Sequence, residues 1–165
     1  MIKYIIITAL ILVLAQACTS DKGSFELVVD QLLTGSVPVI SPQEISERDI
    51  SPVFIDSRSQ EEFQVSHIDG AIFVDYENFD AEELQEVNPS APVVVYCTMG
   101  YRSEKTGEKL RDLGYTNVYN LYGGIIQWKN DGYSVVDNMG MQTDSVHGYS
   151  KAWGHWLKNG IAVYE

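Results

Sequence analysis

The chain has 165 residues, enough for one domain with a sizeable apolar core and short additional segments. Its 11 Lys and Arg residues against 23 Asp and Glu residues give a formal net charge of −12 at pH 7. A nucleic-acid surface needs clustered basic residues, and the sequence has no such cluster. The composition therefore indicates an acidic globular protein and argues against nucleic acid as a partner.

The first seventeen residues have the pattern of an export signal. Lys3 precedes an apolar run from Tyr4 to Leu14, and small residues then lead to Cys18. This run is about half of the ~20 residues that cross a bilayer. The pattern therefore predicts a signal peptide over residues 1–17 and not a membrane helix.

The residues around Cys18 resemble the lipobox of bacterial lipoproteins, in which the cysteine after the cleaved bond carries lipid. The segment departs from the usual pattern, because Leu14 lies one place too far upstream and Gln16 is larger than the common small residue. The resemblance implies a lipid-attached tether and N-terminal helix over residues 18–36, and a membrane-anchored protein of the bacterial cell envelope that faces the periplasm. Ordinary signal cleavage after Ala17 would break the same bond, so that alternative stays open. If Cys18 carries lipid, Cys97 has no disulfide partner.

Helical and strand patterns alternate through the rest of the chain. Apolar residues at helical spacing predict a helix from Phe25 to Leu33 that is ended by Gly35. Short apolar runs predict five strands, at 37–40, 52–56, 70–75, 92–97 and 117–121. Helices are predicted after Ser41, at 61–65, 80–87, 103–113 and 123–132. This alternation predicts an α/β fold, with a parallel sheet of about five strands and helices on both faces.

Cys97 ends the most apolar strand at the point where a helix follows. Sites in parallel sheets lie beyond the carboxyl ends of the strands, and a helix start supplies free N–H groups and a partial positive charge. Gly100 permits a tight loop, and Arg102 adds a permanent charge with a planar fork suited to oxyanions. Such surroundings stabilise a thiolate. The alternative is that Cys97 is an inert, buried cysteine. The glycine, arginine and serine that follow Cys97 in the sequence favour a reactive cysteine instead.

Three segments resemble single-domain rhodaneses, which are thiosulfate sulfurtransferases and persulfide carriers. The loop CTMGYRS is similar to the family's active-site loop, and VFIDSRSQEEFQVSHIDGAI and LRDLGYTNVYNLYGGIIQWKNDGYSVV are similar to its flanking motifs. The resemblance covers residues 37–137 and implies a rhodanese-like fold for them. Residues 138–165 are then a C-terminal extension, which we expect to pack on the domain through Trp153 and Trp156 and to brace it instead of forming part of the site. Ser66 and Gly107 depart from the family's usual glycine and alanine.

The resemblance implies that Cys97 takes a sulfane sulfur from thiosulfate or a persulfide donor and gives it to a thiol or cyanide acceptor. Arg102 is expected to favour dianionic thiosulfate over donors of lower charge. Asp56 and Arg58 are expected to tie the second strand to neighbouring loops. A monomer without metal or cofactor is expected. The persulfide would be bound by the residues that follow the cysteine, which are Thr98, Met99, Gly100, Tyr101, Arg102 and Ser103.

Other functions fit the residues less well. A phosphatase of the related cell-cycle type would have five residues between its cysteine and arginine, whereas four separate Cys97 from Arg102. A non-catalytic rhodanese-like binding module anchored at the envelope is the alternative from another class, although inactive members usually lack the loop cysteine. His67 matches a structural position of the family and is not expected to act as a base. The sequence has no Cys-x-x-Cys motif, which removes a thioredoxin-like function.

Overall fold

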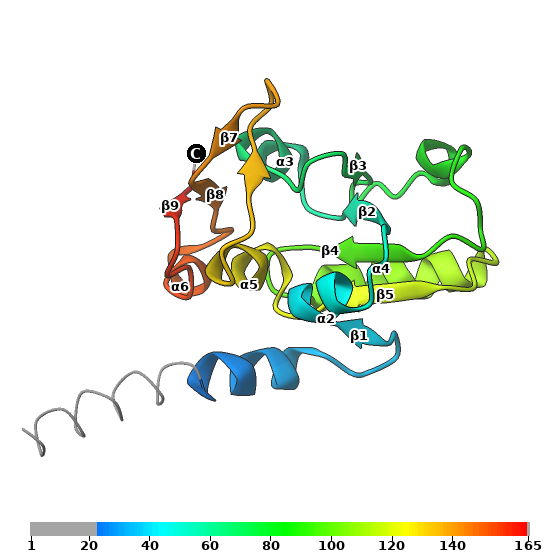
Figure 1. The fold of residues 1–165 in the computed structure, drawn as a ribbon, viewed down its shortest axis with the longest axis horizontal. Coiled ribbons are helices and arrows are strands. Elements are labelled where there is room, and N and C mark those ends of the chain that lie inside the picture. The colour runs from blue at the N-terminus through cyan, green and yellow to red at the C-terminus, as the bar shows by residue number, and fades with distance from the viewer. Residues whose placement is uncertain (1–22, 165) are drawn as a thin grey trace, which may run out of the picture.

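The computed structural model describes residues 23–164 (Figure 1). The predicted signal peptide at 1–17 and the predicted lipid site at Cys18 lie outside these residues. Within the described part of the chain, no helix has both the length and the apolar character needed to span a membrane. The first described element is a helix that covers residues 23–32, close to the predicted one.

A five-stranded parallel sheet forms the centre of the domain, in the order β1-β5-β4-β2-β3. Every neighbouring pair is parallel, and the register places Ile55 beside Val95 in the middle of the sheet. The predicted fold class is therefore confirmed. The strands are β1 Val39–Ile40, β2 Val53–Asp56, β3 Ile72–Phe73, β4 Val93–Tyr96 and β5 Val118–Leu121.

The helices of the domain begin largely where the sequence predicted them. Ser41 accepts a hydrogen bond from the Glu44 N–H as the N-cap of α2, and Ser59 does the same for α3. The predicted helix at 80–87 is instead the short 3₁₀ helix η1, which Asp80 caps by accepting from the Glu82 N–H and which is not extended, because Pro89 disfavours a helical conformation at the residue before it. The helices are α2 Pro42–Glu47, α3 Gln60–Val65, η1 Ala81–Leu84, α4 Tyr101–Asp112 and α5 Gly124–Asn130.

Helices cover both faces of the sheet, as the packing of β4 shows. Its four residues are buried and alternate between two apolar clusters. Val94 and Tyr96 pack with Ile125 of α5, whereas Val93 and Val95 pack on the opposite face with Leu110 of α4. An apolar run without polar alternation is the pattern of a central parallel strand, and it leads the chain directly from the core to Cys97.

Two segments outside the sheet meet at one end of the domain. Phe25 and Val29 of the N-terminal helix form a third cluster with Met99 and Ile126, and Trp153 and Trp156 of the C-terminal extension pack against it. The rings of Phe25 and Trp156 lie 5.6 Å apart between centroids. In Figure 1 the N-terminal helix (blue) runs along the bottom, and the red end of the chain lies above it at the left. The loop after β4 is thus enclosed by both ends of the described chain.

The extension forms two small sheets and one short helix. The first sheet pairs β6 and β7 in antiparallel fashion, and the second pairs β8 and β9 in parallel. Val146 of β8 and the nearby Leu157 are buried in the same cluster as Ile125. The elements are β6 Val135–Val136, β7 Gln142–Thr143, β8 Ser145–His147, α6 Lys151–Gly154 and β9 Ile161–Val163.

Candidate active site

The loop between β4 and α4 holds the cysteine sulfur against the backbone N–H of Gly100. The Gly100 N–H donates to Cys97 Sγ at 3.1 Å, and only 3% of the cysteine is exposed. Gly100 has a φ of +121°, a conformation that side-chain-bearing residues rarely adopt, so this turn needs glycine. Gly100 precedes the first helical residue, Tyr101, and the N–H groups of Tyr101, Arg102 and Ser103 therefore have no acceptor within α4. The loop is a cradle of backbone donors.

Asn120 of β5 fixes the shape of this cradle from below. It is fully buried, its Nδ2 donates to the Gly100 carbonyl at 3.0 Å, and its Oδ1 accepts from the Ser103 hydroxyl at 2.7 Å. The same hydroxyl lies 3.5 Å from Cys97 Sγ. Asn120 was not predicted as a site residue, although a polar residue inside an otherwise apolar strand is a usable signal.

The start of α5 supports the other side of the loop. The Ile125 N–H donates to the Cys97 carbonyl at 2.9 Å, and the Ile126 N–H donates to the Thr98 carbonyl at 3.4 Å. This close approach is open only to glycine at position 124, because an added Cβ would lie 2.3 Å from the Cys97 carbonyl oxygen. Gly124 belongs to a motif that carried the family resemblance, but its role beneath the cysteine was not predicted.

Arg102 is held in a network with Glu62 of α3, which our sequence analysis also missed. The guanidinium donates to both carboxylate oxygens at 2.7 and 2.8 Å, and to Thr98 Oγ1 at 2.8 Å. The Thr98 hydroxyl in turn donates to Glu62 Oε1 at 2.9 Å. Burial alone would raise the pKa of Glu62, but the hydrogen bonds and charge of Arg102 outweigh it and lower that pKa to about 2. The positive charge of Arg102 is therefore compensated by a neighbour.

Asp56 and Arg58 form a fully buried ion pair behind the loop. Arg58 Nη2 donates to Asp56 Oδ2 at 2.6 Å and to the Ser66 carbonyl, so the pair joins the end of β2 to the segment after α3. Burial lowers the pKa of Arg58, but the charge and hydrogen bond of Asp56 together with the nearby Tyr96 and Glu62 outweigh it, and the pKa is raised. His67 stacks on Phe63 with 3.9 Å between ring centroids and does not line the Cys97 cavity.

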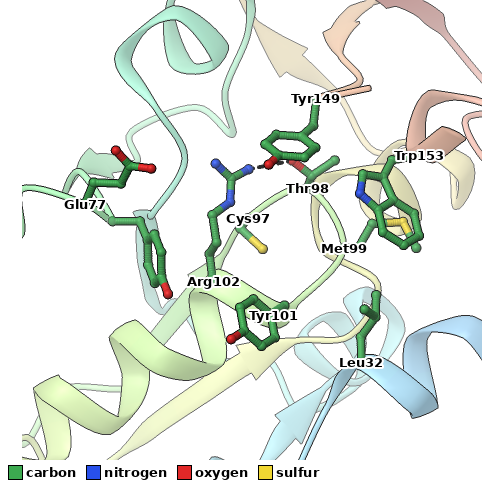
Figure 2. A pocket seen from close by; sticks show the side chains of 10 residues that line it. Leu32, Glu77, Cys97, Thr98, Met99, Tyr101, Arg102, Tyr149 and Trp153 are labelled. Atoms are coloured by element: carbon green, nitrogen blue, oxygen red, sulfur yellow. Dashed lines mark hydrogen bonds between the residues drawn. The ribbon is translucent and has the colours of Figure 1, made fainter. Parts of the chain in front are cut away.

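A cavity of about 280 Å³ opens over Cys97 (Figure 2). Figure 2 shows the sulfur atom toward the middle of the surrounding side chains. Gly100 and Ser103, which were predicted with the binding residues, contact the sulfur from the loop instead of lining this cavity. The lining residues are Leu32, Tyr76, Glu77, Cys97, Thr98, Met99, Tyr101, Arg102, Tyr149 and Trp153.

The C-terminal extension takes part in this cavity, so it contacts the candidate site as well as packing on the domain. Tyr149 and Trp153 both line the cavity, and Arg102 lies over the Tyr149 ring with 5.0 Å from its guanidinium carbon to the ring centroid. Tyr149 has a φ of +61°, which is uncommon for a residue with a side chain. The extension begins far from the loop in sequence, so no periodicity in the chain could reveal this contact.

A second cavity of about 350 Å³ adjoins the first and has an acidic lining. The two share Tyr76, Glu77, Arg102 and Tyr149. The second also contains Glu61, Glu62 and Asp75, together with Arg58, Ser59 and His147. Across residues 23–164, no group of three or more His, Cys, Asp and Glu side chains is arranged to hold a metal ion.

A family model matches more than half of the chain. The sequence profile of the rhodanese-like domain matches residues 41–131. The tRNA uridine(34) hydroxylase of Erwinia tasmaniensis is 36% identical over 85 residues, which are 48% of this chain and 24% of that protein. The adenylyltransferase and sulfurtransferase UBA4 of Meyerozyma guilliermondii is 32% identical over 99 residues, which are 56% of this chain and 22% of that protein. The chain therefore spans about a quarter of the length of these relatives.

Solved structures show the same fold at lower identity. The thiosulfate sulfurtransferase of Pseudomonas aeruginosa has a TM-score of 0.56 and 23% identity over 73% of this chain and 23% of that one. The rhodanese-like domain of an Anabaena protein has a TM-score of 0.55 and 21% identity, covering 61% of this chain and 79% of that one. At these identities the likeness concerns the fold alone.

Proposed function

The chain belongs to the rhodanese-like domain family, and from that premise we propose that it is a sulfurtransferase that works through a persulfide on Cys97. In the first half-reaction the Cys97 thiolate attacks the outer sulfur of thiosulfate, the sulfur–sulfur bond of the donor breaks, and sulfite leaves. With a persulfide donor the leaving group is a thiolate. In the second half-reaction a thiol or cyanide acceptor attacks the outer sulfur and Cys97 returns to the thiolate.

The observation that carries this proposal is the position of Cys97 Sγ. It accepts the Gly100 N–H at 3.1 Å, lies at the amino end of the 12-residue helix α4 and borders a cavity. Backbone donors and the helix end favour negative charge there. They favour the thiolate that attacks and the persulfide anion that results, so a separate general base is not required.

Intact-mass measurement after incubation with thiosulfate tests the proposal. One added sulfur on the wild-type protein, absent from Cys97→Ser and removed by cyanide with formation of thiocyanate, supports it. Cys97→Ser is a close control because a hydroxyl fills nearly the same space but forms no persulfide. If neither thiosulfate nor an organic persulfide adds sulfur to Cys97, the chain is better explained as a non-catalytic binding module.

The cellular setting is part of the same proposal. A signal peptide over residues 1–17 and lipid on Cys18 would place the domain at the surface of a bacterial membrane, facing the periplasm. The polar residues Thr19, Ser20 and Asp21 that follow Cys18 suit a short tether to the helix at residues 23–32. A monomer then acts on small donors and thiols, with the anchor as its contact to the membrane.

A further inference from the structure

We propose that the Cys97 cavity selects organic sulfur donors that have an apolar body and low charge over inorganic thiosulfate. This inference rests on the proposed sulfurtransferase function and adds the substrate class. It also assigns the selection to residues outside the matched family domain. Residues 41–131 match that domain, whereas Leu32, Tyr149 and Trp153 of the cavity wall lie before or after it.

The chemistry of the cavity wall favours a donor with an apolar body. Leu32, Met99 and Trp153 form an apolar side next to the cysteine, as Figure 2 shows. Leu32 and Trp153 are held in place because they pack in the same cluster as buried Met99 and Ile126. Three tyrosines, Tyr76, Tyr101 and Tyr149, supply aromatic rings on the remaining sides. The apolar part of this wall gains free energy from an apolar or aromatic group but not from the sulfonate oxygens of thiosulfate.

The balance of charge around the cavity disfavours a dianionic donor. Arg102 is the only Lys or Arg in the cavity lining within the described chain, and both prongs of its guanidinium face Glu62. Glu77 lines the cavity as well, and no Lys, Arg or His of residues 23–164 forms an ion pair with it. The whole chain carries a formal charge of −12. A dianion therefore approaches an acidic surface with little positive charge beyond the backbone donors.

Transfer from an organic donor follows the same bond changes as transfer from thiosulfate. An organic persulfide anion loses its outer sulfur to the Cys97 thiolate, its sulfur–sulfur bond breaks, and an organic thiolate leaves. A thiosulfonate anion reacts likewise and releases a sulfinate. In both reactions one anion and one thiolate give one persulfide anion and one anionic product, so no oxidant or reductant is consumed.

Three donors separate the effect of charge from that of the apolar body. Thiosulfate is a dianion, methanethiosulfonate is a small monoanion, and benzenethiosulfonate is a monoanion with an aromatic ring. With cyanide as acceptor, we expect kcat/KM of the wild-type protein to rise in that order. The aromatic donor should exceed its methyl counterpart by about tenfold or more, since a buried ring removes much apolar surface from water. Equal values for the two thiosulfonates overturn the inference.

Two tryptophan variants test where the preference originates. Trp153 lines the cavity, whereas Trp156 packs on Phe25 in the same cluster and is outside the lining. Trp153→Ala should reduce the ratio of aromatic to methyl donor to about threefold or less, whereas Trp156→Ala should leave that ratio unchanged even where its melting temperature falls. An unchanged ratio in a folded Trp153→Ala, or the same drop in both variants, contradicts the assignment.

Alkylation of Cys97 gives a second readout that does not require sulfur transfer. Wild-type protein should react faster with N-benzyl iodoacetamide than with iodoacetamide, after each rate is divided by that of a free thiol. Leu32→Ser, which keeps both tryptophans, should lower this ratio, so the test stands where Trp153→Ala does not fold. If no donor loads Cys97 but the benzyl preference is present, the proposed function fails and the apolar site remains. If donors load Cys97 without any aromatic preference in either assay, the function stands and this inference fails.

Discussion

Arg102 and Glu62 form two hydrogen bonds of 2.7 and 2.8 Å at the edge of the Cys97 cavity. The pair joins the first turn of α4 to α3, and Thr98 closes a triangle with both side chains. Only 17% of the Arg102 side chain and 3% of the Glu62 side chain are exposed. A buried pair with two parallel hydrogen bonds fixes geometry strongly. Arg102 is therefore positioned to hold the loop at Thr98, with its charge already matched.

This relationship changes what we expect of Arg102→Ala. From the sequence we expected a larger loss with dianionic thiosulfate than with donors of lower charge. With its charge paired, Arg102 should instead matter for loop shape, and kcat/KM should fall about 10- to 100-fold for thiosulfate and methanethiosulfonate alike. Arg102→Lys is the control, because it keeps the charge but loses the planar fork. If Arg102→Lys recovers kcat/KM for thiosulfate but not for methanethiosulfonate, the result supports the direct electrostatic role that we expected from the sequence.

The same pair predicts a specific acid sensitivity. The pKa of Glu62 is about 2 in the folded protein, below its ordinary value of 4.5. Because the pKa of Glu62 is lower in the folded than in the unfolded protein, ionised Glu62 stabilises the fold at pH values above the unfolded-state pKa. This stabilisation is lost as the pH falls from about 4.5 through about 2. The stability difference between wild type and Glu62→Gln should be on the order of 3 kcal/mol at pH 6 and about half of that at pH 3. Urea unfolding of both proteins at the two pH values measures it; a pH-independent difference contradicts the assignment.

Local signals explain why the fold could be predicted from the sequence. The buried strand before Cys97 was visible as an uninterrupted apolar run, and the Ser41 cap marked the start of α2. Gly107, where the sequence departs from the family's usual alanine, lies in the middle of α4. An added Cβ there would lie 3.1 Å from the Val37 side chain and 3.5 Å from that of Val118 in β5, so the helix packs closely on the sheet. These features depend on neighbours in sequence or on one periodicity, which the chain displays directly.

The residues that support the site could not be predicted, because their contacts join segments that lie far apart in the sequence. Glu62 lies in an acidic run that resembles a solvated helix face, and its partner Arg102 is 40 residues away. Asn120 and Gly124 act on the loop only after β5 and α5 have packed beneath it. Tyr149 reaches the cavity from an extension with no periodic relation to the loop. Contacts of this kind arise from tertiary structure, and a single sequence does not reveal them.

Removing the amide of Asn120 should loosen the cradle without touching the cavity wall. Asn120→Ala removes the 3.0 Å bond from Nδ2 to the Gly100 carbonyl, which keeps its bonds from the Ser103 hydroxyl and the Glu104 N–H, and should cost about 1 kcal/mol of stability. Asn120→Asp is the sharper variant, because it keeps an acceptor for Ser103 but sets a carboxylate against the Gly100 carbonyl. Both should slow alkylation of Cys97 by iodoacetamide relative to wild type, since the Gly100 N–H is no longer held toward the sulfur. Unchanged alkylation in a folded Asn120→Asp protein would count against a role in positioning the loop.

The proposed anchor makes a separate prediction about where the protein is found. One acyl chain gives marginal membrane binding, whereas two or more give stable attachment. When the full chain is expressed in a bacterium, wild type should therefore fractionate with membranes, and Cys18→Ser should appear in the soluble periplasmic fraction. Mass measurement of the purified wild-type protein should show lipid on residue 18. A wild-type protein that is soluble after export would support ordinary signal cleavage.

A last prediction compares two glycines that share a backbone conformation but differ in surroundings. Gly124 has a φ of +58° and Gly70 has a φ of +73°, so alanine is strained at both positions. An added Cβ meets nothing within 4 Å at Gly70, but at Gly124 it lies 2.3 Å from the Cys97 carbonyl oxygen and 2.7 Å from Thr98 backbone atoms. Gly70→Ala should therefore cost only the strain, about 1 kcal/mol. Gly124→Ala should cost about 3 kcal/mol or more, since rigid backbone must also move.

The two variants also separate stability from loop geometry. Urea unfolding gives the stability of each, and sulfur loading of Cys97 at a temperature where both are folded gives the competence of the loop. Gly70→Ala should load sulfur at the wild-type rate, because Gly70 is outside the cavity lining. Gly124→Ala should lose at least tenfold, because displacement of the Cys97 and Thr98 carbonyls breaks the 2.9 Å bond from Ile125 that fixes the cradle. Equal loading by both variants would mean that α5 supports the fold of the domain and not the geometry of the persulfide site.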